Sequence, residues 1–209
     1  MLQATPIVFV VDDDISIRES LELLIRCAGW QPETFASAQE FLSHPRELAP
    51  SCLILDVNLP DLSGLELQKR VTDGREDLPI IFITGYGDVP MTVQAMKGGA
   101  TEFLTKPFVD DVLLSAIHHA IERSSNSLGH EVEMQALRAN YASLTPRERE
   151  VMRLVVSGRL NKQVGGELGI SEITVKAHRG KVMQKMKARS IAELVTVAAK
   201  LELATAPKH

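Results

Sequence analysis

Short apolar runs alternate with amphipathic stretches along the first 123 residues of the chain. Most of the runs are continuous rather than alternating, a pattern that favours strands buried on both faces of a sheet. They are IVFVV (7–11), ETFA (33–36), CLIL (52–55), IIFI (80–83) and EFL (102–104). Helical patterns lie between and after them, in SIRESLELLIRCAG, in SAQEFLSH and at residues 64–72, 89–98 and 110–123. Five strand–helix units in succession predict a parallel sheet between two layers of helices.

From Leu144 onward the pattern is helical alone. Helices are expected at residues 146–157, 161–168, 172–187 and 190–201, with short turns between them. The preceding segment RSSNSLGH (123–130) is polar and contains Gly129, which indicates a linker or a helix break. EVEMQALRANYASL then forms a loosely amphipathic helical pattern. It either couples the two regions or pairs with a second copy of the chain, and a plain connector fits equally well.

These boundaries divide the chain into two domains and a linker. Residues 5–123 are expected to form a flavodoxin-like α/β domain, doubly wound around a five-stranded parallel sheet of strand order 2-1-3-4-5. Residues 124–141 form the linker, for which a helix is one of the open readings, and residues 142–206 form an all-helical domain. The length of 209 residues agrees with two domains, because it exceeds the common size of one.

Charge is divided unequally between the two domains. Residues 1–140 contain 10 Lys and Arg against 21 Asp and Glu, whereas residues 141–209 contain 13 against 6. The first domain therefore suits a cation and the second a polyanion. The two cysteines, Cys27 and Cys52, lie in apolar segments and are expected to be reduced core thiols of a cytoplasmic protein. No apolar run approaches the roughly 20 residues that cross a bilayer, so no membrane partner is expected.

Polar side chains stand at the carboxyl ends of the expected strands. They are Asp12, Asp13, Asp14, Asp56, Thr84 and Lys106. Because the first and third strands are neighbours in the expected sheet, Asp12, Asp13 and Asp56 converge on one crevice. Asp14 is expected to do no more than cap the helix that follows it.

Carboxylates this close together repel and raise one another's pKa, and a divalent cation removes the conflict. Mg²⁺ suits a site that offers carboxylates, waters and phosphate oxygens. Lys106 adds a further positive charge, and Thr84 adds a hydroxyl donor. A carboxylate nucleophile, a metal and donors around the transferred oxygens are the parts of a phosphoryl-transfer site, so we predict that Asp56 is phosphorylated.

Four motifs, VVDDD, LILDVNLPDLSG, IIFITGYGDV and EFLTKPF, resemble in this order the receiver domain of two-component response regulators. The resemblance implies that a sensor histidine kinase phosphorylates Asp56. It also implies that Mg²⁺ is held by Asp13, Asp56 and the backbone carbonyl of Asn58, with Asp12 acting through water.

The same resemblance assigns the remaining groups of the site. Lys106 binds the phosphoryl group and is joined to Pro107 by a cis peptide bond. Thr84 rotates toward the phosphoryl group, and Phe103 is the aromatic switch that swings inward with it. The reactions implied are Mg²⁺-dependent phosphorylation of Asp56 and its hydrolysis, so the protein is not expected to be an enzyme that acts on an external substrate.

The helical domain carries a helix-turn-helix pattern. Gly169 supplies the turn, and Ser171 caps the helix EITVKAHRGKVMQKM. The apolar side chains expected to face a core from this helix are Ile173, Val182 and Met186. The basic side chains expected to point elsewhere are Lys176, Arg179, Lys181 and Lys185. A basic helix after a glycine turn is typical of a recognition helix in the major groove of DNA.

The motifs LTPREREV, NKQV, ELGIS and TVKAHR resemble the LuxR/NarL-type helix-turn-helix. The resemblance implies that Lys176, Ala177 and Gly180 face the bases. The implied candidates for phosphate contacts are Lys162, Thr174, Arg179 and Lys181. Because Gly180 cannot donate a side-chain hydrogen bond, base readout in this chain rests on fewer direct contacts.

The stretch TGYGDVPMTVQAMKGGATEFLTKPF resembles the FixJ subgroup of response regulators. This implies a transcriptional regulator that is activated by phosphorylation of Asp56 and forms a homodimer through about residues 89–108. The dimer would bind a palindromic operator in double-stranded DNA, with RNA polymerase as a further partner.

Two alternatives stay open at this point. One is a phosphohydrolase with an aspartyl-phosphate intermediate, which is disfavoured because Asn58 stands where such enzymes place a second aspartate. The other is a receiver-controlled protein-interaction module with weak or no specific DNA binding. The steep salt dependence of phosphate contacts would separate this module from a DNA-binding regulator.

Overall fold

The structure of the chain is a computed structural model that describes residues 5–45, 48–74 and 78–201. The chain forms two compact units, one up to Gly129 and one from His130 onward. The boundary falls within the segment predicted as the linker.

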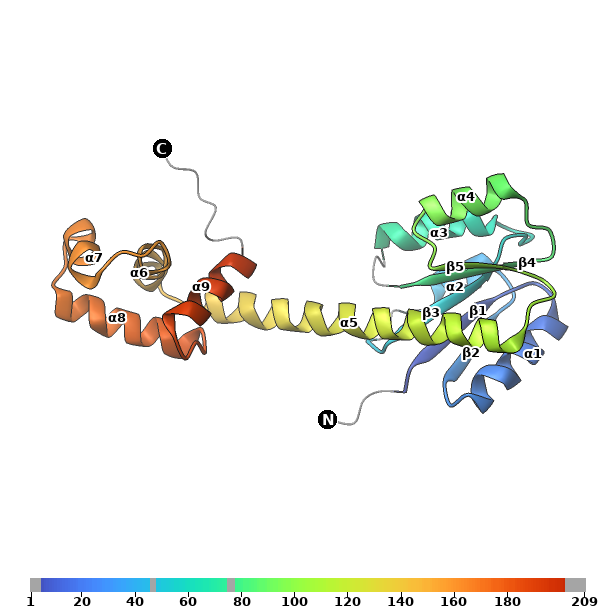
Figure 1. The fold of residues 1–209 in the computed structure, drawn as a ribbon, viewed down its shortest axis with the longest axis horizontal. Helices are drawn as coiled ribbons and strands as arrows, with labels where there is room; N and C mark the ends of the chain where they lie inside the picture. The colour runs from blue at the N-terminus through green and yellow to red at the C-terminus, as the bar shows by residue number, and fades with distance from the viewer. Residues whose placement is uncertain (1–4, 46–47, 75–77, 202–209) are drawn as a thin grey trace. The chain divides into compact units, whose positions relative to one another are not determined.

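A five-stranded sheet forms the centre of the first unit (Figure 1). Its strands are β1 (Ile7–Val11), β2 (Gln31–Phe35), β3 (Ser51–Asp56), β4 (Ile80–Thr84) and β5 (Glu102–Thr105). Neighbouring strands pair in parallel in the order β2-β1-β3-β4-β5. This is the predicted order, and it places the carboxyl ends of β1 and β3 side by side.

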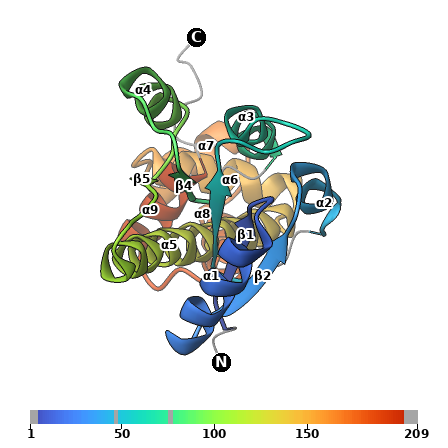
Figure 2. The same ribbon diagram turned by 90° about the vertical axis from the view of Figure 1, so that its right-hand side faces the viewer.

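Helices cover both faces of the sheet (Figure 2). The helices of this unit are α1 (Ile15–Cys27), α2 (Ala38–Ser43), α3 (Gly64–Gly74), α4 (Val89–Lys97) and the first part of α5 (Asp110–Ala142). Helices α1 and α5 pack on one face, and α2, α3 and α4 pack on the other. The Asp14 side chain accepts a hydrogen bond from the backbone N–H of Ser16 and thereby caps α1, as predicted.

Strand side chains alternate between two hydrophobic cores. Phe9 and Leu53 pack toward α2, α3 and α4, whereas Val10 and Ile54 pack toward α1 and α5. Every residue of β1 and β4 is buried, which explains why their sequences are continuously apolar. The continuous apolar runs therefore predicted the positions of β1 and β4 correctly.

The two cysteines differ in their environments. Cys52 is buried in β3, as predicted, and its burial raises the pKa of the thiol. The prediction that Cys27 is a core thiol is wrong, because this residue is exposed at the last position of α1. The apolar residues around Cys27 in the sequence face the core from other sides of the helix.

Helix α5 continues without interruption from Asp110 to Ala142. The helix break that the polar segment and Gly129 suggested is therefore absent, and the predicted linker is helical. Glycine in a helix destabilises it by roughly 1 kcal/mol relative to alanine. The good helix formers that follow Gly129, in EVEMQALRAN, offset this cost.

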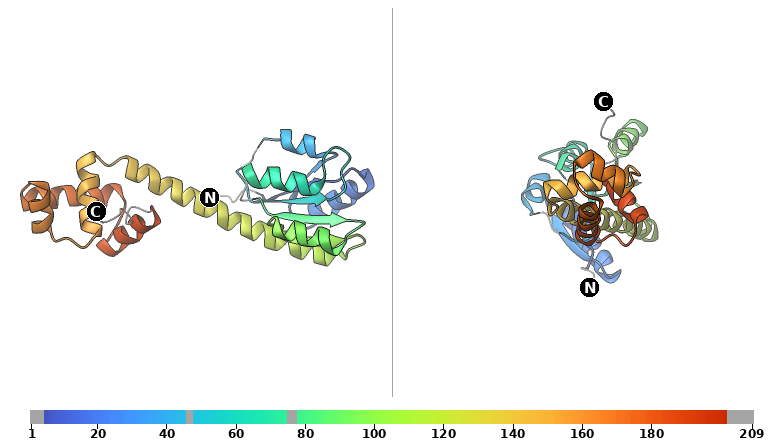
Figure 3. Two further views of the ribbon diagram at one scale, coloured as in Figure 1. Left: turned by 90° about the horizontal axis from the view of Figure 1, so that it is seen from above. Right: turned by 90° about the vertical axis from the view of Figure 1, so that its left-hand side faces the viewer.

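The second unit contains the end of α5 and, within the described residues, four further helices, labelled in Figure 1 and seen from two further sides in Figure 3. They are α6 (Pro146–Val156), α7 (Asn161–Leu168), α8 (Glu172–Lys185) and α9 (Ile191–Lys200). Their shared core includes Val151, Val164, Val175, Val182 and Leu194. Gly169, at φ +66°, ends α7 in the left-handed conformation, and Ser171 then caps α8, so the predicted helix-turn-helix is formed.

Candidate functional site

Three carboxylates meet where β1 and β3 end. Val11 pairs with Leu55, so the next residues on the two strands, Asp12 and Asp56, leave the sheet side by side. Asp13 joins them, and one carboxylate oxygen from each of the three residues lies within 4.8 Å of the others. Asp12 is fully buried and Asp56 is 7% exposed, whereas Asp13 is exposed. The predicted acidic cluster is therefore formed.

Lys106, directly after β5, reaches back across the sheet edge to this cluster. Its Nζ donates to Asp12 Oδ2 at 2.6 Å and to Asp56 Oδ2 at 3.3 Å. Burial raises the pKa of Asp56, although the positive charge of Lys106 works against this rise. Burial alone would lower the pKa of Lys106, but its hydrogen bond to Asp12 and the two negative charges raise it overall. Lys106 is therefore held as a cation between the two buried carboxylates.

One ammonium group does not neutralise three carboxylates, so the cluster has room for a further positive charge. Its carboxylate oxygens are ligands that Mg²⁺ prefers, and the exposed Asp13 would leave room for waters on a bound ion. The Asn58 backbone N–H donates to Asp56 Oδ1 at 3.3 Å. The metal-ligand role of the Asn58 carbonyl stays a prediction.

The two residues predicted to switch lie in β4 and β5, Thr84 at the end of β4 and Phe103 within β5. Thr84 is fully buried, and its Oγ1 accepts a hydrogen bond from the Tyr86 backbone N–H at 3.3 Å. The half-buried ring of Phe103 packs at 6.1 Å from that of Phe82. Lys106 and Pro107 are joined by the expected cis peptide bond.

Gly87 lies close to both Thr84 and Phe103, the two residues predicted to switch, and sequence reasoning missed it. A Cβ at this position would lie 2.9 Å from the Thr105 methyl group, 3.0 Å from the Phe103 ring and 3.4 Å from the Thr84 methyl group. A larger residue would therefore force these side chains to shift. The signal in the sequence was the glycine itself, three residues after Thr84.

Two further residues support the acidic cluster and were also missed. The Arg18 guanidinium donates to the backbone carbonyls of Asp12 and Asp13 at 2.7 and 2.9 Å, and so fixes the loop that carries both carboxylates. Gly64 lies so close to Asp56 that a Cβ would overlap the Asp56 carbonyl oxygen. Neither role has a sequence signal, because both contacts go to backbone carbonyls, whose positions no side-chain pattern reveals.

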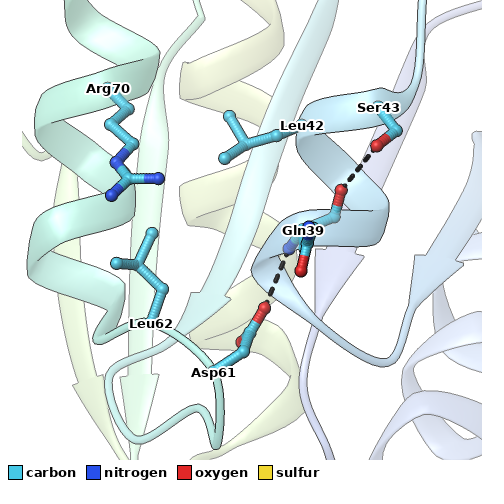
Figure 4. A pocket seen from close by; sticks show the side chains of 6 residues that line it. All are labelled: Gln39, Leu42, Ser43, Asp61, Leu62 and Arg70. Atoms are coloured by element: carbon cyan, nitrogen blue, oxygen red, sulfur yellow. Dashed lines mark hydrogen bonds between the residues drawn. The ribbon is translucent and has the colours of Figure 1, made fainter.

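A separate pocket of about 360 Å³ lies between α2 and α3 (Figure 4). It is lined by Gln39, Leu42, Ser43, Asp61, Leu62 and Arg70. Asp61 accepts hydrogen bonds from the backbone N–H groups of Ala38 and Gln39 and so holds the first turn of α2. None of the lining residues belongs to the acidic cluster.

In the second unit, α8 presents the residues predicted to contact DNA. Lys176, Ala177 and Gly180 are exposed on one side of the helix. Lys181 is exposed on one flank of this side, and Thr174 bonds to the Ser171 hydroxyl at 2.8 Å on the same flank.

The remaining two residues predicted to contact phosphates, Arg179 and Lys162, either contact α7 or lie on it. Arg179, on the opposite flank of α8, donates to the Asn161 side chain at 2.8 Å, so α7 orients it. Lys162 is exposed in the first turn of α7.

Two sequence-based expectations for α8 are wrong. Ile173 does not face the core but is 80% exposed, because the helix turns only Val175, Val182 and residues near them inward. Lys185 does not project freely but donates to the buried Glu148 carboxylate at 2.7 Å and to the Ser143 carbonyl at 3.0 Å. Ile173 was expected in the core because it is hydrophobic, and Lys185 was expected in solvent because it is charged. Neither property decided where the side chain lies.

Known families match both units of the chain. The family described as response regulator receiver domain matches residues 8–118, and the family described as bacterial regulatory proteins, luxR family, matches residues 142–198. The chain belongs to the response regulators. Its receiver fold and its LuxR-type DNA-binding domain are those predicted, and a DNA-binding regulator is favoured over the alternatives.

Individual response regulators resemble this one over most of their length. Nodulation protein W of Bradyrhizobium diazoefficiens is 51% identical over 189 residues, which cover 90% of this chain and 83% of that protein. Transcriptional regulatory protein FixJ of the same organism is 42% identical over 91% of this chain and 93% of its own. The solved structure of response regulator StyR has a TM-score of 0.87 and 48% identity, covering 94% of this chain and 100% of that one.

In this response regulator, the buried Glu148 carboxylate joins α6 to α8. Its hydrogen bond with Lys185 and its bond with the Thr145 backbone N–H lower its pKa.

None of the helices in the described residues combines the length and apolar character that a membrane crossing requires.

We expect the Glu148→Gln variant to destabilise the helical unit by roughly 1–2 kcal/mol at neutral pH, since bonds to a charged acceptor are stronger than neutral ones. Because the pKa of Glu148 is lower in the folded state, its contribution is present above the unfolded value of about 4.3 and is lost as pH falls through the folded value. Hydrogen exchange of α6 and α8 in the full chain measures the difference. Glu167→Gln, at an exposed position of α7, is the control. Equal protection in both variants at pH 7 would contradict the role of the pair.

Proposed function

We propose that Asp56 of this response regulator is the phosphoryl acceptor and that a sensor histidine kinase is the donor. The observation that carries the proposal is Lys106, which bridges Asp12 and Asp56 within a cluster of three carboxylates. The ammonium group stands beside the Asp56 oxygen, where negative charge gathers when a phosphoryl group is attached.

In the proposed step, a carboxylate oxygen of Asp56 attacks the phosphorus of a phosphohistidine on the kinase. The O–P bond forms, the P–N bond breaks, and its electron pair returns to the imidazole. Lys106 stabilises the charge on the transferred oxygens. Mg²⁺, held by Asp13, Asp56 and the Asn58 carbonyl, with Asp12 acting through water, supplies further charge neutralisation when bound. Water later hydrolyses the acyl phosphate, so this chemistry stays confined to Asp56.

The phosphorylated state is proposed to change the surface of α4 and β5. Thr84 and Phe103 lie between Asp56 and that surface along the sheet, in contact with the space that Gly87 leaves open. Helix α4 presents three exposed apolar side chains, Val89, Val93 and Met96, which suit a homodimer contact within residues 89–108. Phosphorylation then shifts a two-state equilibrium because it stabilises one state more than the other.

The dimer is proposed to place two copies of α8 on a palindromic operator in double-stranded DNA. Lys176, Ala177 and Gly180 face the bases, while Lys162, Thr174, Arg179 and Lys181 contact phosphates. RNA polymerase is proposed as a further partner, and the cytoplasm as the location where kinase, DNA and polymerase meet. Residues 5–123, 124–141 and 142–206 serve as receiver, helical connector and DNA-binding domain.

A DNA-binding titration of the full chain tests this function. Beryllofluoride, an analogue of the phosphoryl group, is expected to tighten binding by roughly 5- to 150-fold, the usual range of coupling between two sites, and to shift the chain toward a dimer in sedimentation. The logarithm of the binding constant is expected to fall steeply with the logarithm of salt concentration. Equal affinity with and without beryllofluoride would contradict the switch.

A further inference from the structure

The exposed side of α8 carries residues whose identity the packing of the protein does not explain. At about 100° per residue, Ile173, Ala177 and Gly180 form one stripe, opposite the buried Val175 and Val182. Ile173 is 80% exposed, and Ala177 and Gly180 are exposed as well. A β-branched aliphatic side chain is only a moderate helix former, and contact with water does not stabilise it. The exposed Ile173 side chain is therefore available to a partner from outside the chain.

Gly180 is a second residue without an explanation inside the protein. A Cβ built at this position meets no atom within 4 Å in the part of the chain that the structure describes. The residue lies inside a regular helix and does not adopt a positive φ. Glycine destabilises a helix interior relative to alanine. A glycine here is thus useful where something outside the chain approaches the helix backbone closely.

We propose that this stripe reads thymine. Ile173 and Ala177 pack against C5-methyl groups of thymine in the major groove, and Gly180 lets α8 lie close to the base edges. The thymine methyl is the apolar group that a base pair presents in this groove, and apolar side chains are its usual contacts. The inference rests on the proposed function, in which α8 is the recognition helix, and adds Ile173 to the residues that determine its specificity.

The charges around the stripe favour DNA over a protein as its partner. Lys176 and Lys181 are exposed beside it, and Arg179 stands on the far flank, held by Asn161. Lys176 lies 3.9 Å from Glu172, which is a long contact for an exposed ion pair and leaves the ammonium group accessible. An apolar stripe with Lys181 on one flank and Arg179 on the other matches a groove floor between two phosphate strands, whereas a second copy of α8 would bring like charges together.

The experiment begins with selection of binding sites from random double-stranded DNA by the beryllofluoride-treated full chain. Each thymine of the selected half-site is then replaced by deoxyuridine, which removes only the methyl group. Burial of one methyl corresponds to roughly a fourfold change in affinity at 25 °C. We expect a loss of this size for the wild type at one or two positions in each half-site.

Two variants assign the loss to the side chain. In Ile173→Ala, one of the deoxyuridine effects is expected to disappear, because the methyl has lost its partner. Alanine is the best helix former, so this variant retains α8. Val195→Ala, which shortens an exposed side chain of α9, is the matched control and is expected to retain every deoxyuridine effect.

Gly180→Ala tests the close approach separately. We expect a higher melting temperature together with weaker binding to the selected site, a combination that a merely structural glycine would not produce. Unchanged or tighter binding by this variant would overturn the close approach. The thymine contact is overturned if deoxyuridine is neutral for the wild type, or if Ile173→Ala keeps every effect. A wild type that selects no DNA sequence at all would instead refute the proposed function itself.

Discussion

Asp56→Asn will remove labelling of the full chain by acetyl phosphate, and with it the gain in DNA affinity that follows labelling. Asparagine retains the shape of the side chain but lacks the anionic oxygen that attacks phosphorus. Intact-mass spectrometry measures the label, and DNA titration before and after treatment measures the gain. We expect no added phosphoryl group in the variant, and a gain of roughly 5- to 150-fold in the wild type alone.

Asp14→Asn is the matched control for this experiment. Asp14 lies two residues after Asp12, but its side chain caps α1, and asparagine caps helices about as well as aspartate. This variant is expected to accept the label like the wild type. Labelling of the Asp56→Asn chain at another residue would show that the acceptor has been misassigned, even though the acidic cluster is present.

Lys106→Ala will destabilise the receiver unit by about 3–5 kcal/mol in Mg²⁺-free buffer, the usual cost of removing one partner of a buried ion pair. The variant leaves the fully buried Asp12 carboxylate without its partner at 2.6 Å and also removes the contact with Asp56. Urea unfolding monitored by fluorescence reports the loss, because the chain contains one tryptophan and Trp30 packs against the core of this unit.

Addition of Mg²⁺ is expected to restore part of the lost stability in Lys106→Ala, since the metal replaces the missing positive charge among the carboxylates. Lys97→Ala, at the exposed end of α4, controls for the general effect of deleting a lysine and should change stability by less than about 1 kcal/mol. If both variants unfold at the same urea concentration, the bridge between Asp12 and Asp56 contributes nothing to the fold.

Sequence pattern was sufficient where one physical effect dominates. The strands β1 and β4 are buried on both faces, so their residues are continuously apolar and their positions could be predicted closely. The convergence of Asp12, Asp13 and Asp56 followed from strand order, because parallel strands bring their carboxyl ends to one edge. In the first case burial requires apolar residues along the whole strand. In the second, the order of the strands alone decides which strand ends are neighbours.

Prediction failed where a residue's environment depends on neighbours distant in the sequence or on a choice between helix faces. Cys27 and Ile173 are apolar residues in helices, yet both are exposed. The hydrophobicity of one residue does not reveal which face of its helix packs against the core. Arg18 could not be linked to the acidic cluster, since its bonds go to backbone carbonyls. Gly129 interrupts nothing, because one glycine does not outweigh a long helical segment.

The contact between Gly64 and the Asp56 backbone has a consequence for natural variation in this protein. Position 64 carries no side chain, yet any larger residue would displace the backbone carbonyl oxygen of Asp56. Gly129, whose Cβ would meet no atom within 4 Å in the described residues, has no such constraint. A larger residue at position 129 would therefore meet no steric obstacle inside the described fold, whereas one at position 64 would push the backbone of Asp56 aside.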